Sequence, residues 1–371
     1  MALTKRPPSR SECCSFAAMR RRGAGAQAAT VPSAPKLNPP VSSTSAPKTR
    51  DAYGPRGVPT YAAGARNDVQ IGSLESYKLF DKTGKGAFGV VRKALHSSTG
   101  EEVAIKSVRA GGEALLREAA LLAACVGNPA VVELREVACG AEMDDLHLVM
   151  EFVGPSLHDV MRARRRRGMP FTESEARRVM RRLLGGVEMM HRQGVMHCDL
   201  KPGNVLVGGE DARGRVLKIC DLGLAKFLAA LPRDTPTHQL GGTLWYMAPE
   251  QLLGDNDCVA PVDLWSLGCL MAELVAGEPL FQEENVFKQV GEIVRLLGVP
   301  DEVSLMPLGV SASTPIQLRD AVPEERLSQA GFDVLRGLLE FDPKDRLTAA
   351  AALQMPWFAV EDEDAPSPAR P

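Results

Sequence analysis

The chain has 371 residues, of which 44% are hydrophobic and 24% are charged, and this is ordinary for a globular protein with one large domain or two medium ones. Its 44 basic and 46 acidic residues give a formal net charge of −2, which offers no general attraction to nucleic acid or to an anionic membrane. No run approaches the roughly 18 apolar residues that a membrane span needs.

The eight cysteines are scattered along the chain and form no CxxC pair, so the sequence gives no sign of a zinc site. A chain of this length has enough core-forming sequence to fold without disulfides. We therefore expect reduced thiols in a cytoplasmic and/or nuclear protein.

Residues 1–72 differ from the rest of the chain because Ala, Pro, Ser, Gly and Arg dominate them. Nine basic residues and one acid, Glu12, occur in the first 50 positions. Such a segment buries too little apolar surface to offset the entropy of ordering it, so we expect disorder. An organellar transit peptide and a basic nuclear-import patch remain alternatives. We also expect disorder in the acidic, proline-containing residues 359–371.

Short runs typical of β-strands begin near Tyr77 and are separated by turns. The expected strands include Leu79–Phe80, Val90–Val91, Val103–Ile105, Val131–Leu134 and Leu146–Val149. One helical stretch interrupts them from Glu113 to about Cys125, before a Gly-Asn-Pro sequence that stops it.

Beyond Gly154 the chain becomes mostly helical. Thr172 and Glu175 predict a capping box that starts a long amphipathic helix. Further helical patterns cover Asp263–Gly277, Glu284–Leu297 and Ser328–Glu340. A strand-rich first part and a helix-rich second part predict an α+β protein with a cleft between two lobes.

Arginines crowd one region of the second part, at 162 and 164–167 and again at 177, 178, 181 and 182. We interpret these residues as a solvated face, with a docking surface for acidic segments or a nuclear-import surface as the alternative.

Gly84, Gly86 and Gly89 form the first constellation that suggests chemistry. Glycines at this spacing let the backbone approach phosphate oxygens and donate N–H groups to them. A strand pattern follows them, whereas a dinucleotide-binding fingerprint would open a helix. A tight hairpin without a ligand would use the same residues.

Lys106 ends a buried strand pattern, where its charge needs a partner. Glu118, twelve residues later on the expected helix, can supply one. We favour a phosphate-binding lysine over a surface lysine whose stem packs on the protein.

Two polar loops follow in the helical part. Asp199, Lys201 and Asn204 lie close together in the sequence HCDLKPGN, which can offer a base, a cation and a metal ligand. Asp221 precedes Leu-Gly at the end of a strand, and a carboxylate there suits Mg²⁺, which takes few protein ligands beside substrate phosphates.

Together with Ala248-Pro249-Glu250, these motifs resemble the signature of protein kinases, and the resemblance covers residues 74–358. It implies a bilobal protein kinase fold of the α+β class. A small β-rich N-lobe with one regulatory helix would span 74–153, and a larger α-helical C-lobe would span 154–358.

The resemblance also implies a role for each matching residue, with ATP and Mg²⁺ as cofactors. Asp199 would be the catalytic base and Lys201 would lie near the transferred phosphoryl group. Asn204 and Asp221 would hold the metal. The ATP-binding residues would be Gly84, Lys85, Gly86, Ala87, Phe88, Gly89, Val91, Ala104, Lys106, Glu118, Met150, Glu151, Val153 and Leu206. Lys201 and Thr243 indicate transfer to serine or threonine of protein substrates. Glu250 would pair with Arg346.

Sequence motifs such as VDLWSLGC at 262–269 and LGVPDE at 297–302 resemble those of cyclin-dependent kinases. The sequence as a whole is similar to the plant F-type members. Arg117-Glu118 matches the end of their cyclin-binding helix, which implies a cyclin or another activating subunit as a possible partner. No motif that reads nucleic acid is present.

The departures from that family pattern concern regulation. Cys198 stands where most of these kinases have an arginine that binds a phosphorylated threonine, so we do not expect Thr237 to act as an activating switch. Met247 replaces another arginine, and the pair Gly241-Gly242 replaces bulkier residues, which argues against a requirement for proline after the target. Ala87-Phe88 has no hydroxyl for inhibitory phosphorylation. A pseudokinase scaffold is the alternative function, and the complete catalytic set argues against it.

Overall fold

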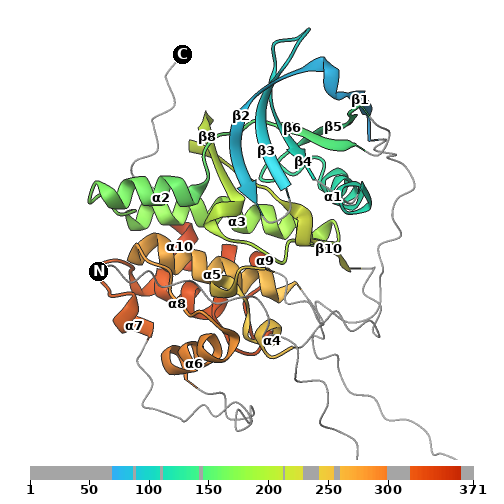
Figure 1. The fold of residues 1–371 in the computed structure, drawn as a ribbon. Helices are drawn as coiled ribbons and strands as arrows, with labels where there is room; N and C mark the ends of the chain where they lie inside the picture. The colour runs from blue at the N-terminus through green and yellow to red at the C-terminus, as the bar shows by residue number, and fades with distance from the viewer. Residues whose placement is uncertain are drawn as a thin grey trace, which may run out of the picture. The chain divides into compact units, whose positions relative to one another are not determined.

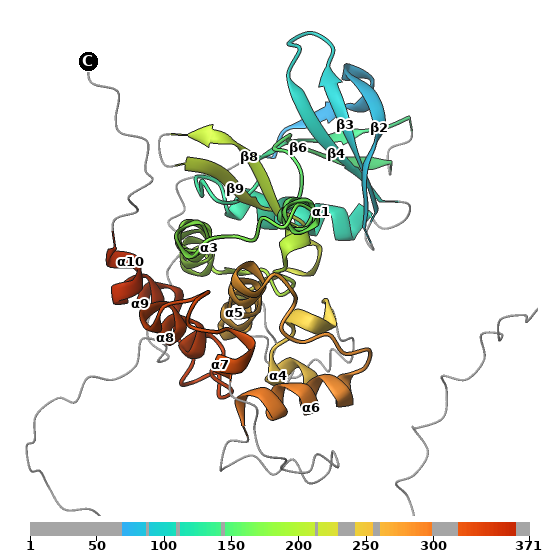
Figure 2. The ribbon, with the colours of Figure 1, turned by 90° about the vertical axis from the view of Figure 1, so that its left-hand side faces the viewer.

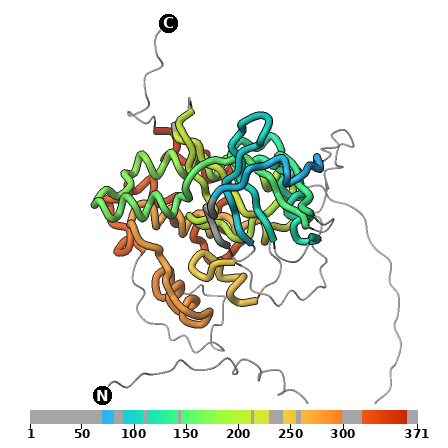
Figure 3. The backbone as a smooth tube through the Cα atoms, turned by 45° about the horizontal axis from the view of Figure 1, so that its top comes forward, coloured from blue at the N-terminus to red at the C-terminus, as the bar shows by residue number. Residues whose placement is uncertain are grey.

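The structure is a computed structural model that describes residues 69–86, 89–108, 112–141, 145–211, 214–228, 242–254, 260–298 and 318–360. Within these residues a sheet-rich lobe comes first and a helix-rich lobe second (Figure 1). Figure 3 shows the blue and cyan strands of the first lobe and the orange helix α6 (Val286–Leu297) on opposite sides of the molecule. The α+β fold with two lobes is therefore confirmed.

Six strands form the sheet of the first lobe, in the order β1-β5-β6-β4-β3-β2. All neighbours are antiparallel except β1, which runs parallel to β5. The strands are β1 (Ile71–Ser73), β2 (Tyr77–Gly86), β3 (Gly89–His96), β4 (Glu102–Ser107), β5 (Leu134–Cys139) and β6 (Leu146–Glu151), and a short 3-10 helix, η1 (Leu74–Ser76), joins the first two. Helix α1 (Gly112–Ala124) packs against β5 and β6.

The two-residue period of β4 divides its side chains between the faces of the sheet. Val103 and Ile105 are buried in a small cluster with Ala94 and Val149 on one face. The residues between and after them, Ala104 and Lys106, therefore point to the opposite face, where they border a cavity. The strand pattern thus decides which side chains reach the site.

The sheet lobe begins earlier than the sequence suggested. We expected disorder through residue 72, but Ile71–Ser73 form β1, paired with Val137–Cys139 of β5. Backbone pairing explains this difference, because a three-residue strand at the edge of a sheet needs no apolar pattern of its own.

The expected strand at Val131–Leu134 is shifted toward the C-terminus, since β5 covers Leu134–Cys139. The two valines instead connect the lobes: Val131 forms an isolated bridge with Ile219, and the N–H of Val132 donates to the Ile219 carbonyl at 2.9 Å. Their apolar side chains are buried in the main core. The sequence looked like a strand because these residues are buried, although they do not belong to a strand of the sheet.

The second lobe is built around two long helices, α3 (Glu173–Arg192) and the almost wholly buried α5 (Pro261–Ala276). The predicted capping box of α3 is present, with the Thr172 hydroxyl accepting from the Glu175 N–H and Glu175 accepting from the Thr172 N–H. Figure 2 shows α9 (Ala349–Leu353), α8 (Gln329–Leu338) and α7 (Leu318–Ala321) on one side of α5, and α4 (Pro249–Leu252) and α6 on the other.

The remaining elements of this lobe are short. The helices are α2 (Leu157–Arg166), α4 (Pro249–Leu252), α7 (Leu318–Ala321), α8 (Gln329–Leu338), α9 (Ala349–Leu353) and α10 (Pro356–Ala359), with 3-10 helices η2 (Pro202–Asn204), η3 (Leu222–Leu224) and η5 (Leu244–Tyr246). Two antiparallel pairs of strands lie beside the polar loops. In one, β8 (Val205–Asp211) pairs with β9 (Gly214–Ile219), and in the other, β7 (Val195–Met196) pairs with β10 (Lys226–Phe227).

The arginine-rich region is only partly a solvated face. The other arginines of α2 are exposed, but Arg164 lies over the Phe171 ring and binds both carboxylate oxygens of Glu175 at 2.8 Å. Arg177 of α3 is buried beside the Trp357 ring. Guanidinium groups stack on aromatic rings as well as pairing with acids, which a charge pattern alone does not reveal.

Candidate active site

A cavity of about 650 Å³ lies between the two lobes. Its lining contains eleven of the residues predicted to bind nucleotide or metal: Gly89, Val91, Ala104, Lys106, Glu118, Met150, Glu151, Val153, Asn204, Leu206 and Asp221. Sequence reasoning missed Val132, Ser156 and Asp159, which reach the cavity from a loop and from α2. A β-like run and a basic helix carry no signal for such positions.

The glycine-rich segment is a hairpin of β2 and β3. Gly84, Lys85 and Gly86 belong to β2, where Gly84 pairs with Val91 and Gly86 with Gly89. Gly89 has φ +151°, and a Cβ there would lie 2.3 Å from the Ser107 carbonyl oxygen, so only glycine fits. Ala87 and Phe88 lie outside the described residues.

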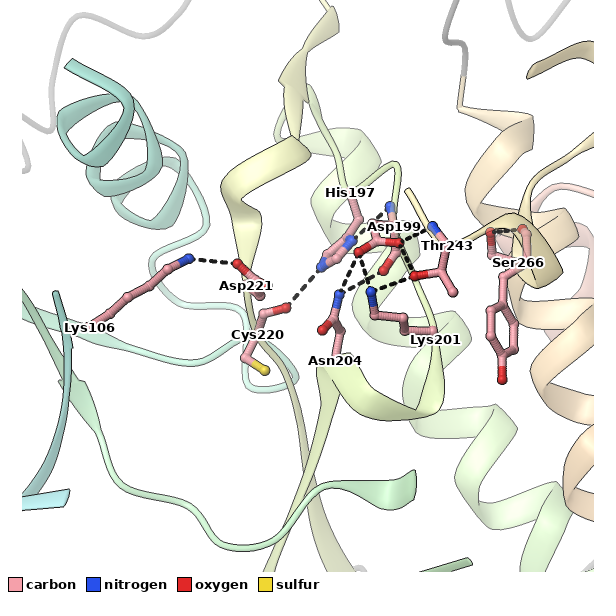
Figure 4. A network of polar contacts seen from close by, with 10 residues as sticks. Lys106, His197, Asp199, Lys201, Asn204, Cys220, Asp221, Thr243 and Ser266 are labelled. Atoms are coloured by element: carbon pink, nitrogen blue, oxygen red, sulfur yellow. Dashed lines mark hydrogen bonds and ion pairs between the residues drawn. The ribbon is translucent and has the colours of Figure 1, made fainter. Parts of the chain in front are cut away.

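Lys106 joins three elements of the site. Its ammonium group lies 2.8 and 2.7 Å from the two carboxylate oxygens of Glu118 on α1. It also lies 2.6 Å from Oδ1 of Asp221 (Figure 4). Burial would lower the pKa of Lys106, but the two neighbouring carboxylates raise it above its ordinary value. The lysine therefore stays charged, and the predicted pair with Glu118 is present.

Asp199 is the centre of a second network (Figure 4). Its Oδ1 accepts from the Thr243 N–H at 2.8 Å and from the Thr243 hydroxyl at 3.0 Å, and its Oδ2 lies 2.6 Å from the Lys201 ammonium. Lys201 also donates to Thr243 Oγ1 at 2.6 Å. The carboxylate is thus fixed by groups from two loops that are more than 40 residues apart.

Asn204 connects Asp199 with the cavity. Its amide nitrogen donates to the carbonyl oxygen of Asp199 at 2.8 Å and to Oδ2 at 3.1 Å. This leaves its amide oxygen pointing away from Asp199 (Figure 4). Asp221 has a left-handed backbone conformation, with φ 63°. Its Oδ1 contacts Lys106, and its Oδ2 does not take part in that contact. Two oxygen donors are therefore available at the edge of the cavity.

Asp263 of α5 fixes the backbone of the loop that carries Asp199. This carboxylate, only 1% exposed, accepts from the N–H groups of His197 and Cys198 at 2.9 and 2.8 Å, and it lies 2.9 Å from His191 Nε2. Burial would raise the pKa of Asp263, but the hydrogen bonds and the two histidines lower it below its ordinary value. Sequence reasoning found α5 but not this role.

Cys198 is a non-glycine residue with φ 63°, and its thiol, next to the Met196 carbonyl, is buried. A thiol in this position cannot make charge-assisted bonds to a phosphate. Thr237, which would carry that phosphate, lies outside the described residues. Arg117 of α1 donates to the Ala225 carbonyl at 3.3 Å.

Cys220 precedes Asp221 and lines the cavity, and its carbonyl oxygen lies 3.0 Å from His197 Nε2. Burial, with a further contribution from the Asp221 charge, raises the pKa of the Cys220 thiol to about 12. His197 thereby bridges the loop of Asp199 and the strand end of Asp221.

An ion pair lies at the hinge, the segment of residues 150–153 that joins the two lobes. Lys218 of β9 lies 2.7 Å from Oε1 of Glu151, the last residue of β6, and the same oxygen accepts from the Glu133 N–H at 2.8 Å. The pair connects a strand of the helical lobe with the segment that joins the lobes.

The segment after the hinge is packed too closely for any side chain at Gly154. This residue has φ +158°, and a Cβ would lie 2.2 Å from the Val207 carbonyl oxygen of β8. We expect Gly154→Ala to destabilise the fold by about 1–3 kcal/mol, because the backbone must move, and to weaken nucleotide binding by displacing the hinge. Urea denaturation and nucleotide titration measure both effects.

Gly185→Ala in α3 is the matched control, because nothing lies within 4 Å of a Cβ there. Its helix propensity should raise stability by up to about 1 kcal/mol. Equal stability of Gly154→Ala and wild type would contradict the proposed close approach.

Comparison with known proteins agrees with this geometry. The family described as protein kinase domain matches residues 77–358. A protein of Oryza sativa subsp. japonica named "Putative cyclin-dependent kinase F-2" is 46% identical over an alignment of 310 positions that covers 78% of this chain and 91% of that protein. "Cell division control protein 2 homolog 3" of Trypanosoma brucei brucei is 36% identical over 302 residues, 77% of this chain and 93% of that protein.

"Cyclin-dependent kinase G-2" of Oryza sativa subsp. indica is 39% identical over 307 residues, 77% of this chain but 42% of that longer protein. The fold and the matched domain define the class of the molecule, and the chain belongs to the protein kinase family. Within that family it is a cyclin-dependent-kinase-like protein, with similarity to F-, G- and B-type plant members. None of the helices in the described part of the chain is both long and apolar enough to cross a bilayer.

Proposed function

We propose that the chain is an active serine/threonine protein kinase that transfers the γ-phosphate of ATP to protein hydroxyl groups. The observation that carries this proposal is the position of Asp199, fixed by Thr243, Lys201 and Asn204, next to a cavity that contains the paired Lys106. A scaffold without catalysis has no need for this arrangement of charges.

In this proposal Asp199 orients the substrate hydroxyl and accepts its proton, because its carboxylate is held by three neighbours. Lys201 supplies positive charge next to Asp199, where it would stabilise the negative charge on the oxygens of the transferred phosphoryl group. Its contact with the Thr243 hydroxyl is consistent with the serine/threonine class. Lys106, kept charged by Glu118, is positioned to bind phosphate oxygens.

The site also suits the nucleotide and its metal. The apolar part of the cavity, formed by Val91, Ala104, Met150 and Leu206, fits a planar base, and the polar residues lie at the other end. Asn204 and Asp221 would hold Mg²⁺ through the oxygens that face the cavity, since Mg²⁺ prefers a few protein oxygens beside phosphates and water. Bound there, Mg²⁺ would neutralise charge on the phosphates.

An activating subunit belongs to the same proposal. Cyclin is the first candidate, because the relatives are named cyclin-dependent kinases. Cys198 and Met247 support activity without a phosphate switch and without a proline requirement.

The test is phosphorylation of a degenerate peptide library by the purified full chain with Mg-ATP. We expect labelled serine and threonine peptides without a preference for proline after the target, with or without added cyclins. Lys106→Met is the control, because it keeps the shape of the site but removes the phosphate-binding charge. Complete inactivity of wild type with every cyclin tested, while ATP still binds, would favour the pseudokinase scaffold.

A further inference from the structure

Four arginines form one surface on α3, here called the arginine face: Arg177, Arg178, Arg181 and Arg182. Residues three and four positions apart are neighbours on a helix, so these side chains lie beside one another. The face is not part of the cavity or of the catalytic network.

The arginine face holds the C-terminal helices of the described chain. Arg181 donates to the Phe358 carbonyl of α10 at 2.8 Å and lies over the Phe358 ring, while Arg177 lies over the Trp357 ring. Figures 1 and 2 show α9 and α10 next to α3. The chain therefore leaves α10 alongside these arginines.

Arg178 has an unusual environment within this face. Ion pairs join Arg177 to Glu173 and Arg182 to Asp211. Arg178 makes no hydrogen bond or ion pair with any other described residue, and its Nη1 is enclosed without an acceptor. An enclosed guanidinium nitrogen without an acceptor costs stability, so the position favours a carboxylate partner.

The sequence places four such carboxylates close by. Glu361, Asp362, Glu363 and Asp364 follow α10 directly and begin three residues after Phe358. An extended chain covers about 3.3–3.6 Å per residue, so the length of chain after Phe358 lets this acidic run reach no farther than roughly 10–20 Å from the Arg181 contact. No other segment of the sequence contains four consecutive acids.

We propose that the acidic run Glu361–Asp364 docks on the arginine face and acts as a strap that holds α10 against α3, with Arg178 as its main partner. The expected contribution is modest and sensitive to salt, because the pairs lie near the surface. The strap stabilises the arginine face of α3, the helix that precedes the loop of Asp199. It takes no part in catalysis.

The experiment is a double-mutant cycle in the full chain. One variant replaces all four acids (Glu361→Lys, Asp362→Lys, Glu363→Lys and Asp364→Lys), one is Arg178→Glu, and one combines them. In 50 mM salt the four-acid variant and Arg178→Glu should each lower Tm by about 2 °C. The combination should restore at least half of that loss, and 1 M salt should abolish the differences. Hydrogen exchange at 355–360 should quicken in the four-acid variant.

Arg166→Glu, at the exposed end of α2, makes the same charge change away from the strap and should not be rescued by the tail variant. If Arg178→Glu does not fold, Arg178→Gln and the tail variant complete the cycle. Additive effects in the cycle, or unchanged exchange at 355–360, would overturn the proposal. Binding of acidic peptides to the face with equal affinity in the presence and absence of the tail would also overturn it, and would make the face a docking site for another protein.

Discussion

Asp199→Asn is expected to lower phosphoryl transfer on the order of a thousandfold, the usual contribution of a general base. Asparagine has nearly the same shape and can still accept from the Thr243 N–H, but it cannot take a proton. Nucleotide affinity should stay close to that of wild type, since Lys106 and the lining of the cavity are unchanged. Single-turnover phosphorylation and a nucleotide titration measure the two quantities separately.

Asp320→Asn provides the control for this experiment, because Asp320 is an exposed residue of α7 far from the cavity in the sequence and in the fold. It should change neither quantity. Retention of wild-type turnover by Asp199→Asn would remove this residue from the role of base.

Asp263→Ala should destabilise the protein by about 3–5 kcal/mol, the range for a buried charge that loses its partners or leaves them unpaired. The substitution leaves the N–H groups of His197 and Cys198 without acceptors in the core. Urea denaturation measures the effect as a lower midpoint at unchanged slope. Asp320→Ala should stay within the small range of surface substitutions.

The dependence on pH gives an independent check. The folded-state pKa of Asp263 is lowered, so its contribution is complete above the ordinary aspartate value near 4 and disappears as the pH falls through the folded pKa. The difference between wild type and Asp263→Ala should therefore shrink in acid. A constant difference down to about pH 2 would show that packing, rather than the charge, explains the loss.

Local sequence patterns predicted most of the fold and many of the residues that line the cavity. The capping box of α3, the division into two lobes and the pair of Lys106 with Glu118 all depend on short spacings that a sequence displays directly. The role of Asp263 could not be predicted in this way, because its partners lie 65 and 66 residues earlier in the chain. Only tertiary packing brings them together.

The differences have a common physical origin. Val131 and Val132 are apolar because they are buried between lobes, and Arg177 is buried because a guanidinium can stack on Trp357. The hydropathy and charge of a residue indicate whether it is buried or exposed, but not which tertiary contacts bury it. β1 shows the reverse situation, in which residues without a strand-like pattern form a strand. Its three residues pair with β5 at the edge of the sheet, although the composition of their segment suggested disorder.

The thiol of Cys220 has a consequence for the response to oxidants. Peroxide reacts with thiolates, and the raised pKa of this thiol keeps nearly all of it protonated at pH 7. The sulfur beside the candidate metal ligand Asp221 therefore resists conversion to sulfenic acid. Peroxide is therefore expected to oxidise the Cys220 sulfur slowly, even though this residue lines the cavity.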